Sequence, residues 1–203
     1  MGYYIIVLGT QDPDIHIDEL IQSLAADGLI AKFEFDTTEQ ADKWTMLDIL
    51  SADGDPLAQL ERNPVIEGEL GQEELDEFKE YIQDYKPASA VKWLTNYFGK
   101  VKVIYAFQML NAAFEDGNFE VVSNIKTKIW NKTIGILQAD NEGFSNEDGY
   151  HILWQFSDTV TGDWSCAVRN WLGKWDKFVM DLGDPIQRQE FQEGKVPKKA
   201  KRL

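Results

Sequence analysis

The stretch "VKVIYAFQML", residues 101–110, is a largely apolar run rich in β-branched and aromatic residues. A run of the same kind, "YYIIVL", stands at residues 3–8. Continuous apolar runs of strand-forming residues are typical of strands that are covered on both faces. We therefore expect residues 3–8 to form a central strand and residues 101–110 a second strand of this kind.

Helical periodicity appears between and after these runs. The spacing of one helix face is followed behind Asp14 by Ile17, Leu20, Ile21 and Leu24, and Gly28 follows the expected end. Apolar residues at helical spacing also predict helices over 72–84, over 87–98, and behind Asn118, where the apolar positions are Phe119, Val122, Ile125 and Ile129.

Strand patterns fill much of the remaining chain. The candidates are "AKFEFD" (31–36), "WTMLDILSA" (44–52), "PLAQLERN" (56–63), "YHILWQFSD" (150–158), "WSCAVRN" (164–170) and "WDKFVMDL" (175–182). A short helix is expected from Pro185. Residues 164–182 also contain a helical stripe, so periodicity leaves hairpin and helix open; we favour the hairpin.

The reason for that preference is an internal comparison. "FEFDTTEQADKW" resembles "WQFSDTVTGDW", and in both segments a tryptophan is followed about twenty residues later by a proline that opens a helix. The sequence therefore predicts an α+β fold, with mixed sheets and packed helices, and suggests a tandem duplication of a β-α-β-β-β-α unit. The expected subdomains are residues 1–110 and 111–203, with one compact domain as the alternative.

Charge separates the body of the chain from its end. The 203 residues include 35 acidic and 20 basic ones, a formal net charge of −15. Five basic residues lie in the last nine, Lys195–Leu203, so residues 1–194 carry −20. Such a body repels nucleic-acid phosphates and anionic lipids, so we expect neither as a partner. The basic tail is expected to be a frayed, solvated terminus without a function.

Acidic residues are densest between Glu67 and Asp84, where eight acids accompany one lysine. An exposed helix face explains this density in most proteins, and an acidic docking surface is the alternative. The candidate partner-binding residues are Glu67, Glu69, Glu73, Glu74, Glu77 and Glu80.

Cysteine and histidine are scarce. Cys166 is the single cysteine, which excludes an internal disulfide and suits a reducing, cytoplasmic setting. No apolar run is long enough for a signal sequence or a membrane span. If the strands on either side of "TVTGD" formed a hairpin, Cys166 would face Gln155, roughly 13 Å from His151, too far for direct proton transfer. Cys166 is therefore expected to be a buried structural thiol.

The stretch "LQADNEGFSNEDGYHILWQF", residues 137–156, raises the question of a metal site. Asp140, Glu142, Glu147 and Asp148 could be calcium ligands, but counting from Asp140 places Phe144, Ser145 and His151 where an EF-hand needs an oxygen ligand, glycine and glutamate. Nucleotide-binding and nucleophile-elbow motifs are absent too. We expect no metal, no cofactor and no catalytic residues.

Three functions remain, and the third, an enzyme that acts through a pair of carboxylates in a cleft, ranks last. The first is a non-catalytic acidic protein that docks a basic protein partner, in the manner of an inhibitor or immunity protein, with charge complementarity guiding association. The second is a protein that binds a small ligand in a cleft between duplicated halves, with Trp44, Trp154 and Trp164 lining the pocket. The sequence does not indicate an oligomeric state.

Overall fold

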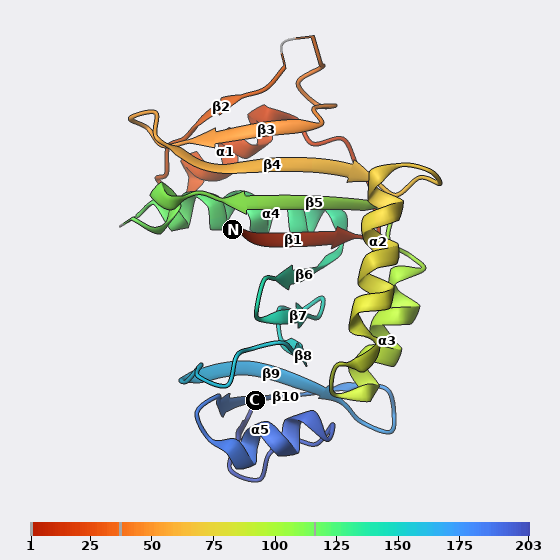
Figure 1. Ribbon diagram of the computed structural model, residues 1–203. Coiled ribbons are helices and arrows are strands. Elements are labelled where there is room, and N and C mark those ends of the chain that lie inside the picture. The colour runs from red at the N-terminus through yellow and green to blue at the C-terminus, as the bar shows by residue number, and fades with distance from the viewer. Residues whose placement is uncertain (1, 37, 116) are drawn as a thin grey trace. The chain divides into compact units, whose positions relative to one another are not determined.

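The computed structural model describes residues 2–36, 38–115 and 117–203. Thr37, inside the first of the two compared motifs, lies outside the described residues. Five α-helices and eleven strands within the described residues confirm a mixed α+β fold (Figure 1). The fold consists of two compact units: Met1–Glu73 with Val101–Gly135, and Glu74–Lys100 with Ile136–Leu203. This division does not follow the expected boundary between residues 110 and 111.

Unit 1 contains a five-stranded antiparallel arrangement with strand order β1-β5-β4-β3-β2. Its elements are β1 (Tyr3–Gly9), α1 (Ile17–Ala26), β2 (Lys32–Glu34), β3 (Met46–Leu50), β4 (Pro56–Pro64), β5 (Val103–Met109), η2 (Asn111–Phe114) and α4 (Asn118–Thr133). Helix α2 (Leu70–Tyr81) begins in this unit and continues into the next.

Strand β5, from the apolar run at 101–110, is the central element of this sheet. It pairs with β1 on one side and with β4 on the other, and all but one of its residues are buried (Figure 1). The two apolar runs at 3–8 and 101–110 are therefore direct neighbours in one sheet. The strand pairing does not show a duplication.

Helices α1 and α4 pack on each other, and α4 contacts β1 and β4. Helix α1 buries Ile17, Leu20 and Leu24 as expected, whereas Ile21, expected on the same face, is 46% exposed. It begins later than expected, because the side chain of His16, and not Asp14, caps it by accepting a hydrogen bond from the backbone N–H of Asp18 at 3.1 Å.

Unit 2 contains the remaining strands in the order β6-β7-β8-β9-β10-β11. Its elements are η1 (Ile82–Asp84), α3 (Ala88–Phe98), β6 (Gly135–Ala139), β7 (Gly143–Ser145), β8 (His151–Trp154), β9 (Asp163–Arg169), β10 (Trp175–Asp181), α5 (Pro185–Gln192) and β11 (Lys201–Arg202). Strands β6 and β7 were not expected from the sequence, since both are short and lie at the start of the polar stretch considered above as a metal site.

Strands β8 and β9 run parallel, with His151 opposite Cys166. The expected hairpin around "TVTGD" is therefore wrong. The segment between β8 and β9 is a crossover connection between parallel strands and not a tight turn. The hairpin expected within residues 164–182 is confirmed, because β9 and β10 pair antiparallel from Asp163↔Asp181 to Arg169↔Trp175. Its turn is stabilised by Asn170, whose side-chain oxygen accepts hydrogen bonds from two backbone N–H groups of the turn.

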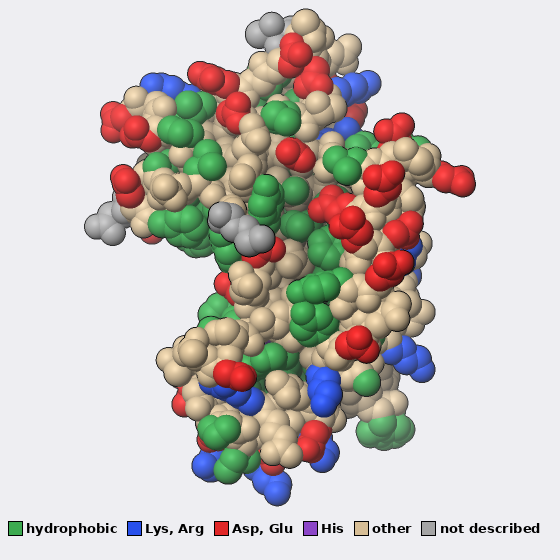
Figure 2. Space-filling view, in the orientation of Figure 1, with side chains coloured by type: hydrophobic (Ala, Val, Ile, Leu, Met, Phe, Trp, Pro, Cys, Tyr) green, Lys and Arg blue, Asp and Glu red, His purple; other side chains and the backbone are tan. Residues whose placement is uncertain are grey.

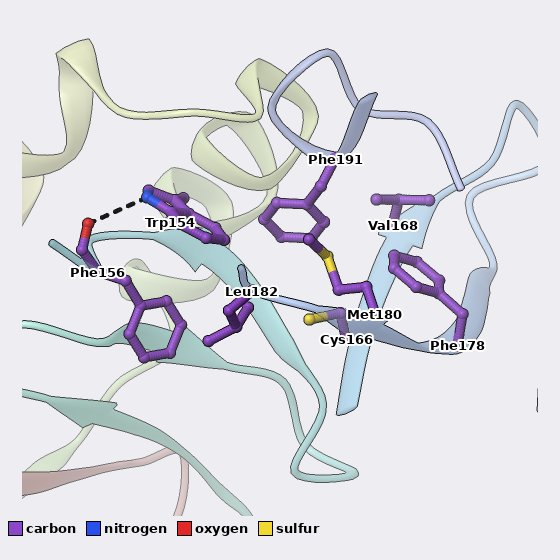
Figure 3. Packing of buried hydrophobic residues seen from close by; sticks show 8 residues of the cluster. All are labelled: Trp154, Phe156, Cys166, Val168, Phe178, Met180, Leu182 and Phe191. Carbon is purple, nitrogen blue, oxygen red and sulfur yellow. Dashed lines mark hydrogen bonds between the residues drawn. The ribbon is translucent and has the colours of Figure 1, made fainter. Parts of the chain in front are cut away.

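A single apolar cluster joins β8, β9, β10 and α5 in unit 2 (Figure 3). Its buried members are Trp154, Phe156, Cys166, Val168, Phe178, Met180, Leu182 and Phe191. Phe191 comes from α5 and Phe178 from β10, and their rings meet edge to face at 6.3 Å. Of the helical stripe within 164–182, Val168, Phe178 and Leu182 are buried in this cluster, whereas Trp171 and Leu172 are exposed at the turn of the hairpin.

The basic tail does not fray. Its residues Lys201 and Arg202 form β11, which pairs with Val179 and Phe178 of β10. The backbone N–H of Leu203 also donates to the carbonyl of Lys177 at 3.0 Å. The expectation of a frayed tail is therefore wrong, because backbone pairing with β10 orders the end of the chain. Among the described residues, no helix combines the length and apolar character needed to cross a membrane.

Candidate functional site

Helix α2 carries an exposed acidic stripe. Leu70, Glu73, Glu77, Glu80 and Tyr81 are all exposed, and at 3.6 residues per turn they fall within roughly 100° of the helix circumference. We call these five residues the acidic face of α2. Figure 2 shows acidic side chains gathered over this helix.

The opposite side of α2 is buried, which fixes the direction of the acidic face. Gly71, Leu75 and Ile82 are buried, and Phe78 packs edge to face on Phe144 at 5.7 Å. A Cβ at Gly71 would lie 2.5 Å from the carbonyl oxygen of Pro64, so only glycine permits this close approach of the helix. The acidic face therefore cannot rotate toward the interior.

Like charges repeat along this face at spacings of three and four residues. Glu73 and Glu77 stand at i and i+4, and Glu77 and Glu80 at i and i+3. Each such pair destabilises a helix by about 0.2–0.5 kcal/mol, and Glu80 also lies near the C-terminus, where the helix dipole disfavours an anion. The one ion pair described within the helix joins Lys79 to Asp76 at 2.6 Å, outside the acidic face. The acidic face is not explained by the stability of the helix.

Two apolar side chains flank the glutamates. Leu70 is 58% exposed and Tyr81 is 55% exposed. The Tyr81 ring is held in place by Tyr85, whose hydroxyl donates to the Tyr81 hydroxyl at 2.7 Å, and the ring centroids are 5.0 Å apart. This hydrogen bond raises the pKa of Tyr85 to about 12. An exposed but pre-oriented aromatic ring beside charged groups is a common anchor in protein interfaces.

The other candidate glutamates occupy different surroundings. Glu67 and Glu69 are exposed in the segment before α2, and Glu74 is half-buried on the helix. The helix thus brings together Glu73, Glu77 and Glu80, whereas Glu67 and Glu69 extend the charge beyond its first turn.

Negative charge is unevenly distributed between the two units. Unit 1 has 19 acidic and 7 basic residues, a formal charge of −12, whereas unit 2 has 16 acidic and 13 basic residues, a formal charge of −3. Five of the acids of unit 2 belong to residues 74–84, so the rest of that unit is close to neutral. Most of the net negative charge therefore belongs to unit 1.

The three candidate pocket tryptophans do not share one environment. Trp44 is buried in unit 1, where its indole N–H donates to the Ile15 carbonyl at 2.9 Å. Trp154 is buried in unit 2, and its indole N–H donates to the Phe156 carbonyl at 3.1 Å. Trp164 is 36% exposed and packs edge to face on the ring of Phe156. None of the three lines the grooves of about 540, 440 and 420 Å³ on the two units.

His151 and Cys166 are neighbours, contrary to the separation of roughly 13 Å expected from a hairpin. Parallel pairing of β8 with β9 places them directly opposite each other. Both are buried, and desolvation raises the pKa of the Cys166 thiol and lowers the pKa of His151 to about 3. Both side chains are therefore neutral at pH 7, and a reactive thiolate is not favoured. The expected role of Cys166 as a buried structural thiol fits this environment, although the pairing used to argue it was wrong.

The acidic stretch at 140–149 is organised by an asparagine. The buried Asn146 accepts hydrogen bonds from the backbone N–H groups of Asp148 and Tyr150, and Asp148 pairs with Lys177 at 2.8 Å. Within the described residues, no group of three or more acidic, histidine or cysteine side chains is placed to hold a metal ion.

Comparisons of this chain with models of protein families, with curated proteins and with solved structures find no match.

Proposed function

We propose that this chain is a non-catalytic binding protein that docks a basic protein partner through the acidic face of α2. The observation that carries the proposal is the placement of three exposed glutamates between Leu70 and the pre-oriented Tyr81 on one side of a helix whose other side is buried. Opposite charge on the partner would speed association, and Leu70 and Tyr81 would supply contact area at the two ends of the acidic face.

Repulsion within the acidic face also favours a cationic partner. The glutamates of the acidic face repel one another, so the free protein carries a modest cost that a cationic partner would remove. A face that existed for helix stability would contain lysine or arginine at these spacings. Neutralising Glu77 and Glu80 as the double variant E77Q/E80Q should therefore stabilise the free protein by about 0.5 kcal/mol at low salt.

The proposal is tested by capture from extract of the source cells with a charge-reversed variant. E73K/E77K/E80K changes the formal charge from −15 to −9. The matched control D53K/E115K/D163K makes the same change at three exposed acids away from α2. Proteins that bind in low salt and elute in high salt should be retained by the wild type and by the control but lost by the α2 variant.

Two outcomes would count against the proposal. If the α2 variant retained the same proteins as the wild type, the acidic face would not be the docking surface. If both triple variants lost them equally, net charge and not the acidic face would explain the binding.

A further inference from the structure

A groove of about 540 Å³ runs along the exposed side of α4 in unit 1, where the end of α1 approaches it. Its size is that of sites for small molecules. Hydroxyl and amide groups dominate its α4 wall, whose central line is formed by Ser123, Thr127 and Asn131 at i, i+4 and i+8. All three belong to one turn-by-turn stripe of the same helix.

Helix stability does not account for this stripe. Serine, threonine and asparagine are each poorer helix formers than alanine, lysine or glutamate, by up to about 0.7 kcal/mol. The helix is held instead by its buried side, where Val122, Ile125 and Ile129 pack. The exposed side could therefore carry better helix formers, but it presents short groups that both donate and accept hydrogen bonds.

An aromatic ring stands at the start of the same groove. Helical spacing groups Phe119 with the buried residues of α4, yet its side chain is 44% exposed and lines the groove. Leu29 from the turn after α1 adds a second apolar surface. The groove thus combines an exposed apolar ring with a row of hydroxyl and amide groups.

The charges in the groove nearly balance. Asp27, Glu120 and Lys128 line it, which leaves one net negative charge in a unit that carries −12. Asn124 donates through Nδ2 to the Asp27 carboxylate at 2.6 Å, and this fixes one wall. The groove therefore lacks a cluster of like charges that could bind a strongly charged ligand. Its neutral hydroxyl and amide groups suit a neutral polar ligand.

We propose that this groove binds a neutral polyhydroxylated ligand of monosaccharide size. Sugar hydroxyls can donate to and accept from Ser123, Thr127 and Asn131, and the apolar face of a sugar ring can cover Phe119. The proposal does not depend on the acidic face of α2, and either can fail without the other.

The test is a titration of the ¹⁵N-labelled full-length protein, followed by amide chemical shifts. The probes are D-glucose, D-galactose, D-mannose and myo-inositol, and tetrahydropyran is the control ring without hydroxyl groups. At least one polyol should shift the amides of Ser123, Thr127 and Asn131 saturably, with a Kd on the order of 1 mM. Tetrahydropyran should not. Absence of saturable shifts with all four polyols overturns the proposal.

A pair of variants separates binding from folding. T127A/N131A removes two polar groups from the groove but improves helix propensity, so it should remain folded. Its affinity for the responding polyol should fall about tenfold, since each lost hydrogen bond contributes modestly. The control T95A/N96A makes the same substitutions on the exposed side of α3 and should keep the wild-type affinity. Equal affinity in wild type and T127A/N131A would contradict the proposal.

Discussion

Burial of His151 makes the stability of the protein depend on pH in a defined direction. His151 is 2% exposed, lies 4.8 Å from the ring of Phe156 and 6.2 Å from that of Phe191, and its Nε2 is buried without a hydrogen-bond partner. Burial lowers its pKa from 6.5 to about 3. The perturbation that tests this is His151→Leu, which replaces the titrating ring with an apolar side chain.

The magnitude follows from proton linkage. Because the folded pKa lies below the unfolded value, the unfolded chain binds a proton between pH 6.5 and 3 that the folded chain does not. The full contribution of His151 to stability is thus present above pH 6.5 and is lost as pH falls toward 3. Between pH 7.5 and pH 5 the loss is about 2 kcal/mol, and it changes little for any folded pKa below about 4. For a chain of this length, that corresponds to a fall in Tm of roughly 4–8 °C.

The assay is urea unfolding at pH 7.5 and pH 5, followed by tryptophan fluorescence, for the wild type and H151L. Lowering the pH from 7.5 to 5 should reduce the unfolding free energy of the wild type by about 2 kcal/mol more than it reduces that of H151L. Protonation of surface carboxylates affects both proteins alike, and both retain His16, so these contributions cancel in the comparison. An identical pH dependence in the two proteins would refute the reasoning, whatever their absolute stabilities.

Three further predictions concern buried positions. Burial raises the pKa of Cys166, so its thiol should resist iodoacetamide in the native protein and react after urea unfolding. Labelling is measured by mass spectrometry, and rapid labelling of the native protein would show that β9 opens. Gly143→Ala should lower the unfolding free energy, measured in urea, by at least about 2 kcal/mol, because its Cβ would lie 2.1 Å from the Leu153 carbonyl oxygen. The control Gly28→Ala is also at positive φ but in open space, so it should lower the unfolding free energy by only about 1 kcal/mol. If both substitutions lowered the unfolding free energy equally, the positive φ and not the contact with Leu153 would explain the destabilisation. Trp44→Phe should lower the unfolding free energy by about 1–3 kcal/mol, because it leaves a buried carbonyl unpaired; an unchanged urea midpoint would argue against that hydrogen bond.

Much of the fold was predictable because its signals are local. The apolar runs at 3–8 and 101–110 became β1 and β5, and the helical spacing of 17–24 became α1. Such features depend on residues within one or two turns of each other, which a single sequence displays directly. An internal comparison, and not a local signal, favoured the hairpin at 164–182 over an equally good helical stripe, although the structure shows a locally stabilised turn at Asn170.

The missed features depend on contacts between distant residues. The parallel pairing that places His151 beside Cys166 has no signature in either strand, because alternation of apolar residues does not identify the neighbouring strand. The grouping of Glu73, Glu77 and Glu80 could be inferred from helical spacing. The exposure of Phe119 could not, since its position relative to Val122 and Ile125 is that of a buried residue, and tertiary packing decides otherwise.

The central place of β5 has a consequence for biosynthesis. During translation the meander β2-β3-β4 can pair as soon as it leaves the ribosome, but β1, although made first, must wait about 100 residues for the strand that lies beside it. Until then the unpaired edge of β1, an apolar strand, is open to wrong partners. Slow synthesis through residues 101–110, or a chaperone that covers β1, would therefore affect the yield of folded protein more than its final stability.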